Sequence, residues 1–255
     1  GRGSRMRSWW AAERNGSAVT RIGWRCEAAA WAACAGWYRI KGIDKASAAA
    51  GALLRQLGPL FPVRKGARIN MQRCFPEAAA PEIERLLGAM WENFGRLAGE
   101  MPHLGVFSGP EFDERVEFIG REKLEALRDA GQPAVIISMH QANWEIGAAA
   151  LSRTGLPCHI TYRPANNPLI DRRITDMRVG YGVKTLTAKG GDGAKALMQA
   201  LKAGEAVALM NDQKMNDGVE APFFGLPSMT APGPTRLAMR HGCPLLPLSI
   251  RRMGG

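Results

Sequence analysis

Several features that mark common protein classes are missing from this chain of 255 residues. No run approaches the roughly 20 apolar residues that cross a bilayer; the best segment, residues 28–38, is alanine-rich and much shorter. The basic start is not followed by a leucine-type apolar run with a cleavage site, so no secretory signal is indicated. The five cysteines include no Cys-x-x-Cys pair. This pattern argues against a zinc knuckle or a disulfide framework and favours a reducing compartment.

Motifs of nucleotide and metal enzymes are missing as well. Residues 189–195 are rich in glycine and lysine, but they lack the spacing and the Lys-Ser/Thr ending of a phosphate-binding P-loop. A flexible turn before a helix explains them. The four histidines are not at metal-ligand spacing, and His140 with Glu145 does not form the His-Glu-x-x-His pattern of zinc proteases. We therefore expect no catalytic metal and no cofactor.

The composition suits a globular protein, since 46% of the residues are hydrophobic and 22% are charged. We predict a basic, tryptophan-bearing, membrane-proximal segment over residues 1–45 and one folded domain over residues 46–255. Residues 1–73 contain 14 basic and three acidic residues, whereas the remainder has 20 of each sign. All of the net charge of +11 is therefore N-terminal. Interleaved tryptophans make an anionic membrane surface the expected partner, rather than nucleic acid; a solvated tail is the alternative.

The order of elements predicts an α/β fold, with a mainly parallel central sheet flanked by helices and with helices at the N-terminus. Short apolar runs predict five strands: 134–139, 158–162, 183–186, 206–210 and 245–250. Helices are expected between them over 143–153, 169–179, 194–203 and 234–240. Apolar residues at helical spacing predict earlier helices over 48–60, 81–101 and 121–130.

Polar side chains follow the predicted strands. His140, Arg163, the pair Asp212 and Gln213, and Arg251 each come just after a strand. In open α/β sheets, ligands bind beyond the carboxyl ends of the strands. These groups are therefore expected to share one cleft.

The segment from His140 to Glu145 is the strongest candidate for chemistry. It places an imidazole and a carboxylate at a strand-to-helix corner, with four residues between them, which suits a general base and its orienting acid. A histidine after a strand can also be a packing or capping residue, and Asn143 is expected to cap the helix. Arg163 suits a phosphate or carboxylate, or alternatively a surface ion pair, and Asp212 can cap a turn or form the cleft floor.

Together, these residues resemble the late lipid A acyltransferases, the lauroyl/myristoyl transferases of Gram-negative bacteria. The similarity covers roughly residues 49–252 and is specific because order and spacing agree. It is carried by His140-Gln-Ala-Asn-Trp-Glu145, Tyr162-Arg163-Pro164, Asp212-Gln213-Lys214, Phe223-Phe224-Gly225 and Thr230-Ala231-Pro232, and upstream by residues 70–77, 91–96 and Glu100.

The resemblance implies a glycerolipid acyltransferase-like fold and transfer of an acyl chain from acyl carrier protein to a hydroxyl of a lipid A precursor. His140 would remove the proton from the hydroxyl and Glu145 would orient the imidazole. The substrate-binding residues would be Arg163, Asn143, Asp212, Gln213 and Glu100. The enzyme would lie on the cytoplasmic face of the bacterial inner membrane, peripheral or weakly anchored.

The chain departs from the family pattern in three ways. Many members have glycine where this chain has Ala142. Members usually begin with a clear membrane-embedding helix, which is weak in this chain. They also usually continue past the last strand, whereas this chain stops at Gly255, so we expect a truncated sequence.

Two other functions remain open from the sequence. One is acyl transfer to another membrane acceptor, such as a glycerophospholipid, an ornithine lipid or a phosphoinositol mannoside. The second is a non-catalytic protein that binds a membrane or nucleic acid through the basic N-terminus. That protein would keep its function when His140 is replaced.

Overall fold

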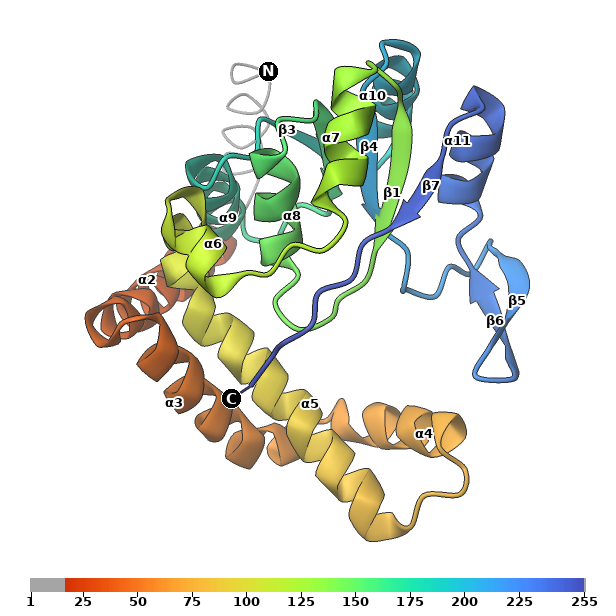
Figure 1. Ribbon diagram of the computed structural model, residues 1–255. Helices are drawn as coiled ribbons and strands as arrows, with labels where there is room; N and C mark the ends of the chain where they lie inside the picture. The colour runs from red at the N-terminus through yellow and green to blue at the C-terminus, as the bar shows by residue number, and fades with distance from the viewer. Residues whose placement is uncertain (1–16, 255) are drawn as a thin grey trace.

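The centre of the protein is a parallel β-sheet. The computed structural model describes residues 17–254. Five strands lie in the order β3-β2-β4-β1-β7, and all neighbours are parallel (Figure 1). The strand bounds are β1 Ala134–Ser138, β2 Cys158–Tyr162, β3 Thr185–Ala188, β4 Ala206–Met210 and β7 Leu245–Pro247. The predicted α/β class with a mainly parallel sheet is confirmed.

Both faces of the sheet are covered because the side chains of the central strands alternate between them. Val135 of β1 and Val207 of β4 face helices α10 (Gly191–Lys202) and α11 (Gly233–His241). Ile136 of β1 lies on the other face, in a core with residues of α7 and α8. The helices of that side are α7 Arg121–Asp129, α8 Glu145–Arg153 and α9 Pro168–Gly180, preceded by η2 Met101–Ser108 and α6 Glu111–Arg115.

A helical layer precedes the sheet. Its elements are α2 Ala18–Lys41, α3 Ile43–Leu57, η1 Gly58–Leu60, α4 Arg64–Cys74 and the long α5 Ala80–Glu100 (Figure 1). Helices α3 and α5 pack very closely, since a Cβ atom on Gly95 would come 2.2 Å from the carbonyl oxygen of Ala50. On Gly99 it would come 2.4 Å from the carbonyl oxygen of Ala46. Two glycines four residues apart therefore set the distance between these helices.

Helix α2 packs on the body of the protein. Asn167, at the start of α9, donates hydrogen bonds to the Trp24 carbonyl oxygen at 3.0 Å and to Glu27 at 2.9 Å. His103 of η2 lies 3.1 Å from the Tyr38 carbonyl oxygen. Residues 1–16 of the predicted membrane-proximal segment lie outside the described residues. Among the helices of the described part, none has the length and apolar character needed to span a membrane.

Strand predictions at the two edges of the sheet were less accurate. Strand β3 begins two residues after the predicted start because Val183 closes the turn after α9, where its N–H bonds to the Arg178 carbonyl oxygen. Strand β7 is shorter than predicted. A hairpin was not predicted at all: β5 Val219–Phe223 and β6 Leu226–Thr230 pair antiparallel around a turn at Phe224 and Gly225. Both turn residues have positive φ, 50° and 72°, as such two-residue turns require.

Candidate active site

The pairing of β1 with β4 brings His140 and Asp212 together. Ser138 is the register partner of Met210 at the carboxyl ends of these strands, so residues two positions further on emerge side by side. The Asp212 carboxylate lies 2.8 Å from His140 Nδ1 and accepts the His140 backbone N–H at 2.7 Å. Two contacts to one carboxylate hold both the ring and the backbone of His140. Trp144 supports the ring edge-to-face, with the centroids 5.0 Å apart.

Electrostatics favour a charged Asp212. Partial burial raises the pKa of this carboxyl, but the hydrogen bonds from His140 outweigh burial, and the net pKa lies below its ordinary value. An ionised carboxylate at Nδ1 accepts a hydrogen bond from the Nδ1–H group and stabilises the positively charged ring. The other ring nitrogen, Nε2, is then the one that can accept a proton.

Glu145 has different partners from the one expected. Instead of the predicted contact with His140, its carboxylate accepts hydrogen bonds from Arg178 Nε at 3.0 Å and Nη2 at 2.6 Å, and from the Tyr181 hydroxyl at 2.5 Å. Glu145 is 3% exposed. Burial raises the pKa of Glu145, but the contacts with Arg178 and Tyr181 lower it by more than burial raises it. The net pKa is therefore below the ordinary value. Burial beside Glu145 raises the pKa of Tyr181.

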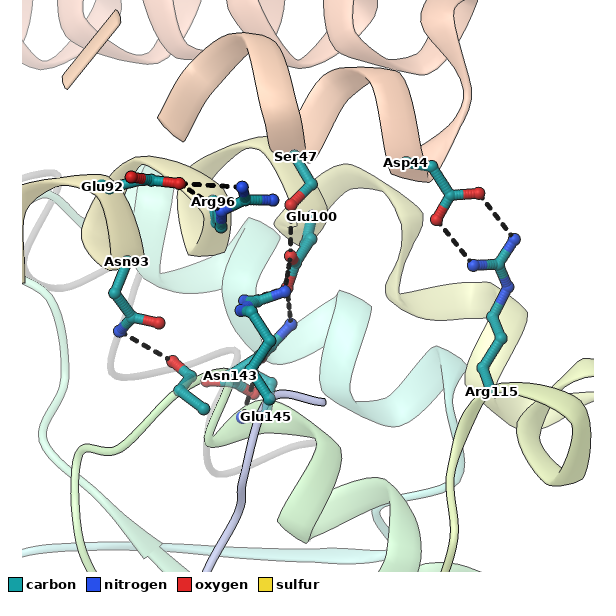
Figure 2. Close-up of polar contacts among 11 residues, drawn as sticks. Asp44, Ser47, Glu92, Asn93, Arg96, Glu100, Arg115, Asn143 and Glu145 are labelled. Atoms are coloured by element: carbon teal, nitrogen blue, oxygen red, sulfur yellow. Dashed lines mark hydrogen bonds and ion pairs between the residues drawn. The ribbon is translucent and has the colours of Figure 1, made fainter. Parts of the chain in front are cut away.

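The corner between His140 and α8 needs an unusual backbone. Ala142 has φ 47°, in the left-handed region that favours glycine. Its carbonyl oxygen accepts a hydrogen bond from Asn93 Nδ2 of α5 at 3.3 Å (Figure 2). The side-chain oxygen of Asn143 accepts the Glu145 N–H at 3.2 Å, as a capping side chain does.

Asn143 and Glu100 belong to a buried network behind the corner (Figure 2). Glu100 accepts hydrogen bonds from Ser47 at 2.6 Å, from Asn143 Nδ2 at 2.7 Å, and from Arg252 at 2.7 and 3.2 Å. This network joins α3, α5, the corner and the C-terminal segment. Both Asn143 and Glu100 were predicted to bind substrate. Neither of them is among the described residues that line the pocket in the next paragraph.

A pocket of about 310 Å³ opens at the carboxyl ends of the strands. Four of the predicted residues line it: His140, Glu145, Arg163 and Gln213. Ile136 and Leu151 are among the apolar lining residues, Lys189 adds positive charge, and the charge of Arg178 is balanced by Glu145. An apolar cavity with a few convergent polar groups at its mouth suits a substrate with a hydrocarbon chain.

Sequence reasoning missed Arg178, Tyr181 and Lys189. Arg178 and Tyr181 sit at the end of α9 and reach Glu145 only through the packing of α9 on α8. Lys189 follows β3, so the rule that ligands bind beyond strand ends could have identified it. The described residues contain no group of three or more histidine, cysteine or acidic side chains placed to hold a metal ion.

The parallel sheet, the histidine–aspartate pair at two strand ends and the adjoining pocket place the chain among α/β proteins whose ligand site lies beyond the carboxyl ends of the strands. The match to a family is more specific. The model of the bacterial lipid A biosynthesis acyltransferase family matches residues 25–255, so the chain belongs to that family. The resemblance found in the sequence is thereby confirmed.

Individual relatives carry two kinds of name. A lipid A biosynthesis acyltransferase of Haemophilus influenzae is 26% identical over 192 residues, which cover 74% of this chain and 59% of that protein. A phosphatidylinositol mannoside acyltransferase of Mycobacterium tuberculosis is 29% identical over 253 residues, covering 91% of this chain and 73% of that protein. A lipid A biosynthesis palmitoleoyltransferase of Escherichia coli is 24% identical over 189 residues, covering 73% and 60%. The chain thus spans only 59–73% of the length of these relatives.

Proposed function

We propose that the protein transfers an acyl chain from the thioester of acyl carrier protein to a hydroxyl of a lipid A precursor. The observation that carries this proposal is the His140–Asp212 pair at the mouth of an apolar pocket. His140 Nε2 takes the hydroxyl proton as the oxygen attacks the thioester carbonyl carbon. The new ester C–O bond forms, the C–S bond breaks, and the imidazolium returns its proton to the thiolate that leaves.

Asp212 and Glu145 have separate duties in this mechanism. Asp212 orients the imidazole and stabilises its charged form without taking the proton itself. The charge of Glu145 is already balanced by Arg178, so this carboxylate acts as a positioning residue that fixes the start of α8 against α9. Asn143 and Glu100 hold the corner from behind, which supports a positioning duty for them rather than substrate contact.

The pocket mouth suits an anionic substrate. Arg163, Lys189 and Gln213 line it beside His140. Guanidinium and ammonium groups bind phosphate and carboxylate, and both occur on lipid A precursors. Arg163 is our choice for that contact. The same cations suit the phosphodiester of the carrier arm.

Phosphatidylinositol mannoside is the second candidate acceptor. The Mycobacterium relative is named for phosphatidylinositol mannoside and matches more of this chain than the Haemophilus relative does. A mannoside hydroxyl would meet the same base, because the proton transfer does not depend on the acceptor's identity.

The decisive experiment supplies purified protein with acyl carrier protein thioester and, in parallel, a Kdo-bearing tetra-acylated lipid A precursor or a phosphatidylinositol mannoside. We expect a mass gain of one acyl chain on the lipid A precursor, and loss of that gain in His140→Ala. A mass gain of one acyl chain on the mannoside alone would identify the mannoside as the acceptor. An active His140→Ala protein would overturn the assignment of the base.

The proposed location is the cytoplasmic face of the inner membrane, where carrier protein and acceptor lipid meet. Ten basic and two acidic residues lie within residues 17–73, which favours anionic lipid and the acidic carrier protein. Deleting residues 1–38 would not test attachment cleanly, because Trp24 and Glu27 bind Asn167. Substitution of exposed residues is the better test.

A further inference from the structure

A second, almost wholly apolar groove lies away from the catalytic pocket. It measures about 670 Å³ and lies between α4, α5 and the tip of the β5–β6 hairpin. Helix α4 contributes one face at helical spacing, through Ala67, Asn70, Met71 and Cys74. The remaining lining residues are Val63, Phe75, Met90, Trp91, Phe94 and Phe224.

The hairpin tip carries an aromatic side chain where the backbone disfavours one. Phe224 has φ 50°, a conformation suited to glycine or asparagine in such turns, and it is 54% exposed. Its ring contacts Phe75 edge-to-face, with the centroids 5.8 Å apart, so the tip and the end of α4 meet at the groove (Figure 1). The ring also contacts Phe223, with the centroids 4.9 Å apart, yet more than half of Phe224 stays exposed on this strained backbone.

The surroundings of the groove are apolar and basic. Val63 is 66% exposed and Phe223 is 60% exposed. Helix α4 contains four basic residues and no acidic one. Arg64 and Arg68 pair with Glu84 of α5, whereas Arg73 makes no ion pair within residues 17–254.

We propose that this face docks on an anionic lipid bilayer, with the aromatic tip and the α4 edge among the lipid chains and one hydrocarbon chain in the groove. Charge complementarity selects this occupant. A second copy of the chain would bring the same basic α4 against itself. A surface of anionic headgroups instead attracts Arg73, and each basic residue near such a surface contributes about 1 kcal/mol to binding. The inference rests on the proposed membrane location and deepens it, because it names the α4 edge and the hairpin tip as the surface that enters the bilayer.

Two substitutions test the proposal with little risk to folding. Phe224→Gly removes the aromatic ring and suits the positive φ of the turn, so the variant should fold at least as well as the parent. Arg73→Glu reverses one exposed charge. Ile119→Ser and Lys123→Glu are the matched controls, since Ile119 is 83% exposed and Lys123 is exposed on α7, far from the hairpin.

The assay is co-sedimentation with vesicles made of equal amounts of phosphatidylglycerol and phosphatidylcholine, compared with vesicles of phosphatidylcholine alone. We expect the parent to prefer the anionic vesicles, with binding weakened about tenfold by Phe224→Gly and about fivefold by Arg73→Glu. Both controls should bind as the parent does, and added salt should weaken binding.

Three outcomes would overturn the proposal: parental binding by both variants, equal binding to neutral vesicles, or conversion of a dimer into a monomer by Phe224→Gly in gel filtration. The last outcome would identify the face as an interface between copies. The vesicle assay contains no acyl donor, so its result is separate from the fate of the acyltransferase proposal.

Discussion

The imidazole of His140 lies 2.8 Å from the carboxylate of Asp212, although 72 residues separate them in the chain. Both follow strands that are direct neighbours in the sheet, and both stand two residues beyond a register pair. The sheet itself therefore builds the pair. Strands β1 and β4 set the positions of the two residues, and an amide of the same shape can still accept the His140 backbone N–H, so an isosteric change tests the charge of Asp212.

Asp212→Asn should lower kcat about 10²- to 10⁴-fold, because an amide does not stabilise the imidazolium or select the tautomer as a carboxylate does. Steady-state acyl transfer measures the effect. Asp217→Asn, an exposed aspartate in the same loop, should retain parental turnover. Equal losses in the two variants would show that the loop, rather than the carboxylate, is what matters.

Glu145→Gln should destabilise the protein by about 3 kcal/mol at pH 7, because Arg178 loses a buried charged partner. The folded protein lowers the pKa of Glu145 below its ordinary value of 4.5, so its contribution is present above pH 4.5 and is lost as the pH falls through the folded pKa. The difference in unfolding free energy between the parent and the variant should therefore shrink on acidification.

Urea denaturation at several pH values measures this difference. Glu82→Gln, which removes an exposed partner of Arg85, is the control and should change stability little at any pH. A difference for Glu145→Gln that stays constant from pH 7 to below pH 4.5 would contradict the ion-pair explanation.

Ala142→Gly should stabilise the protein modestly. The left-handed conformation costs a non-glycine residue about 1–2 kcal/mol. Glycine removes this cost, but its added freedom in the unfolded chain destabilises the folded state by about 0.4–1 kcal/mol. Ala89→Gly, at an exposed position in the middle of α5, should instead cost about 1 kcal/mol. Thermal unfolding of both variants checks the opposite signs, and a loss in both would argue against strain at position 142.

Gly95→Ala should weaken the packing of α3 on α5. The new Cβ atom would come 2.2 Å from a backbone oxygen that cannot turn away, so the helices must separate at a cost of about 1–3 kcal/mol or more. Gly88→Ala in the same helix meets only the end of the Arg55 side chain at 3.5 Å and should be stabilising. Denaturation midpoints of the two variants should therefore move in opposite directions from the parent.

Periodicity was enough to predict much of this fold. Strands β1 and β4 coincide with apolar runs, because a central strand covered on both faces needs apolar side chains at successive positions. The hairpin was missed because β5 and β6 are largely exposed and lack such a run. Helix α4 was missed for the same reason, since none of its residues is buried.

By itself, the sequence determined the α/β class and the placement of His140, Arg163 and Gln213 at strand ends, because apolar period and turn residues are local properties. Only the tertiary structure decided the partners: Asp212 for His140, and Arg178 with Tyr181 for Glu145. The strand order β3-β2-β4-β1-β7 does not follow the chain, so spacing along the sequence could not show which strand ends meet. Hydrogen bonds depend on atoms within about 3 Å in space, and the sheet brings those atoms together.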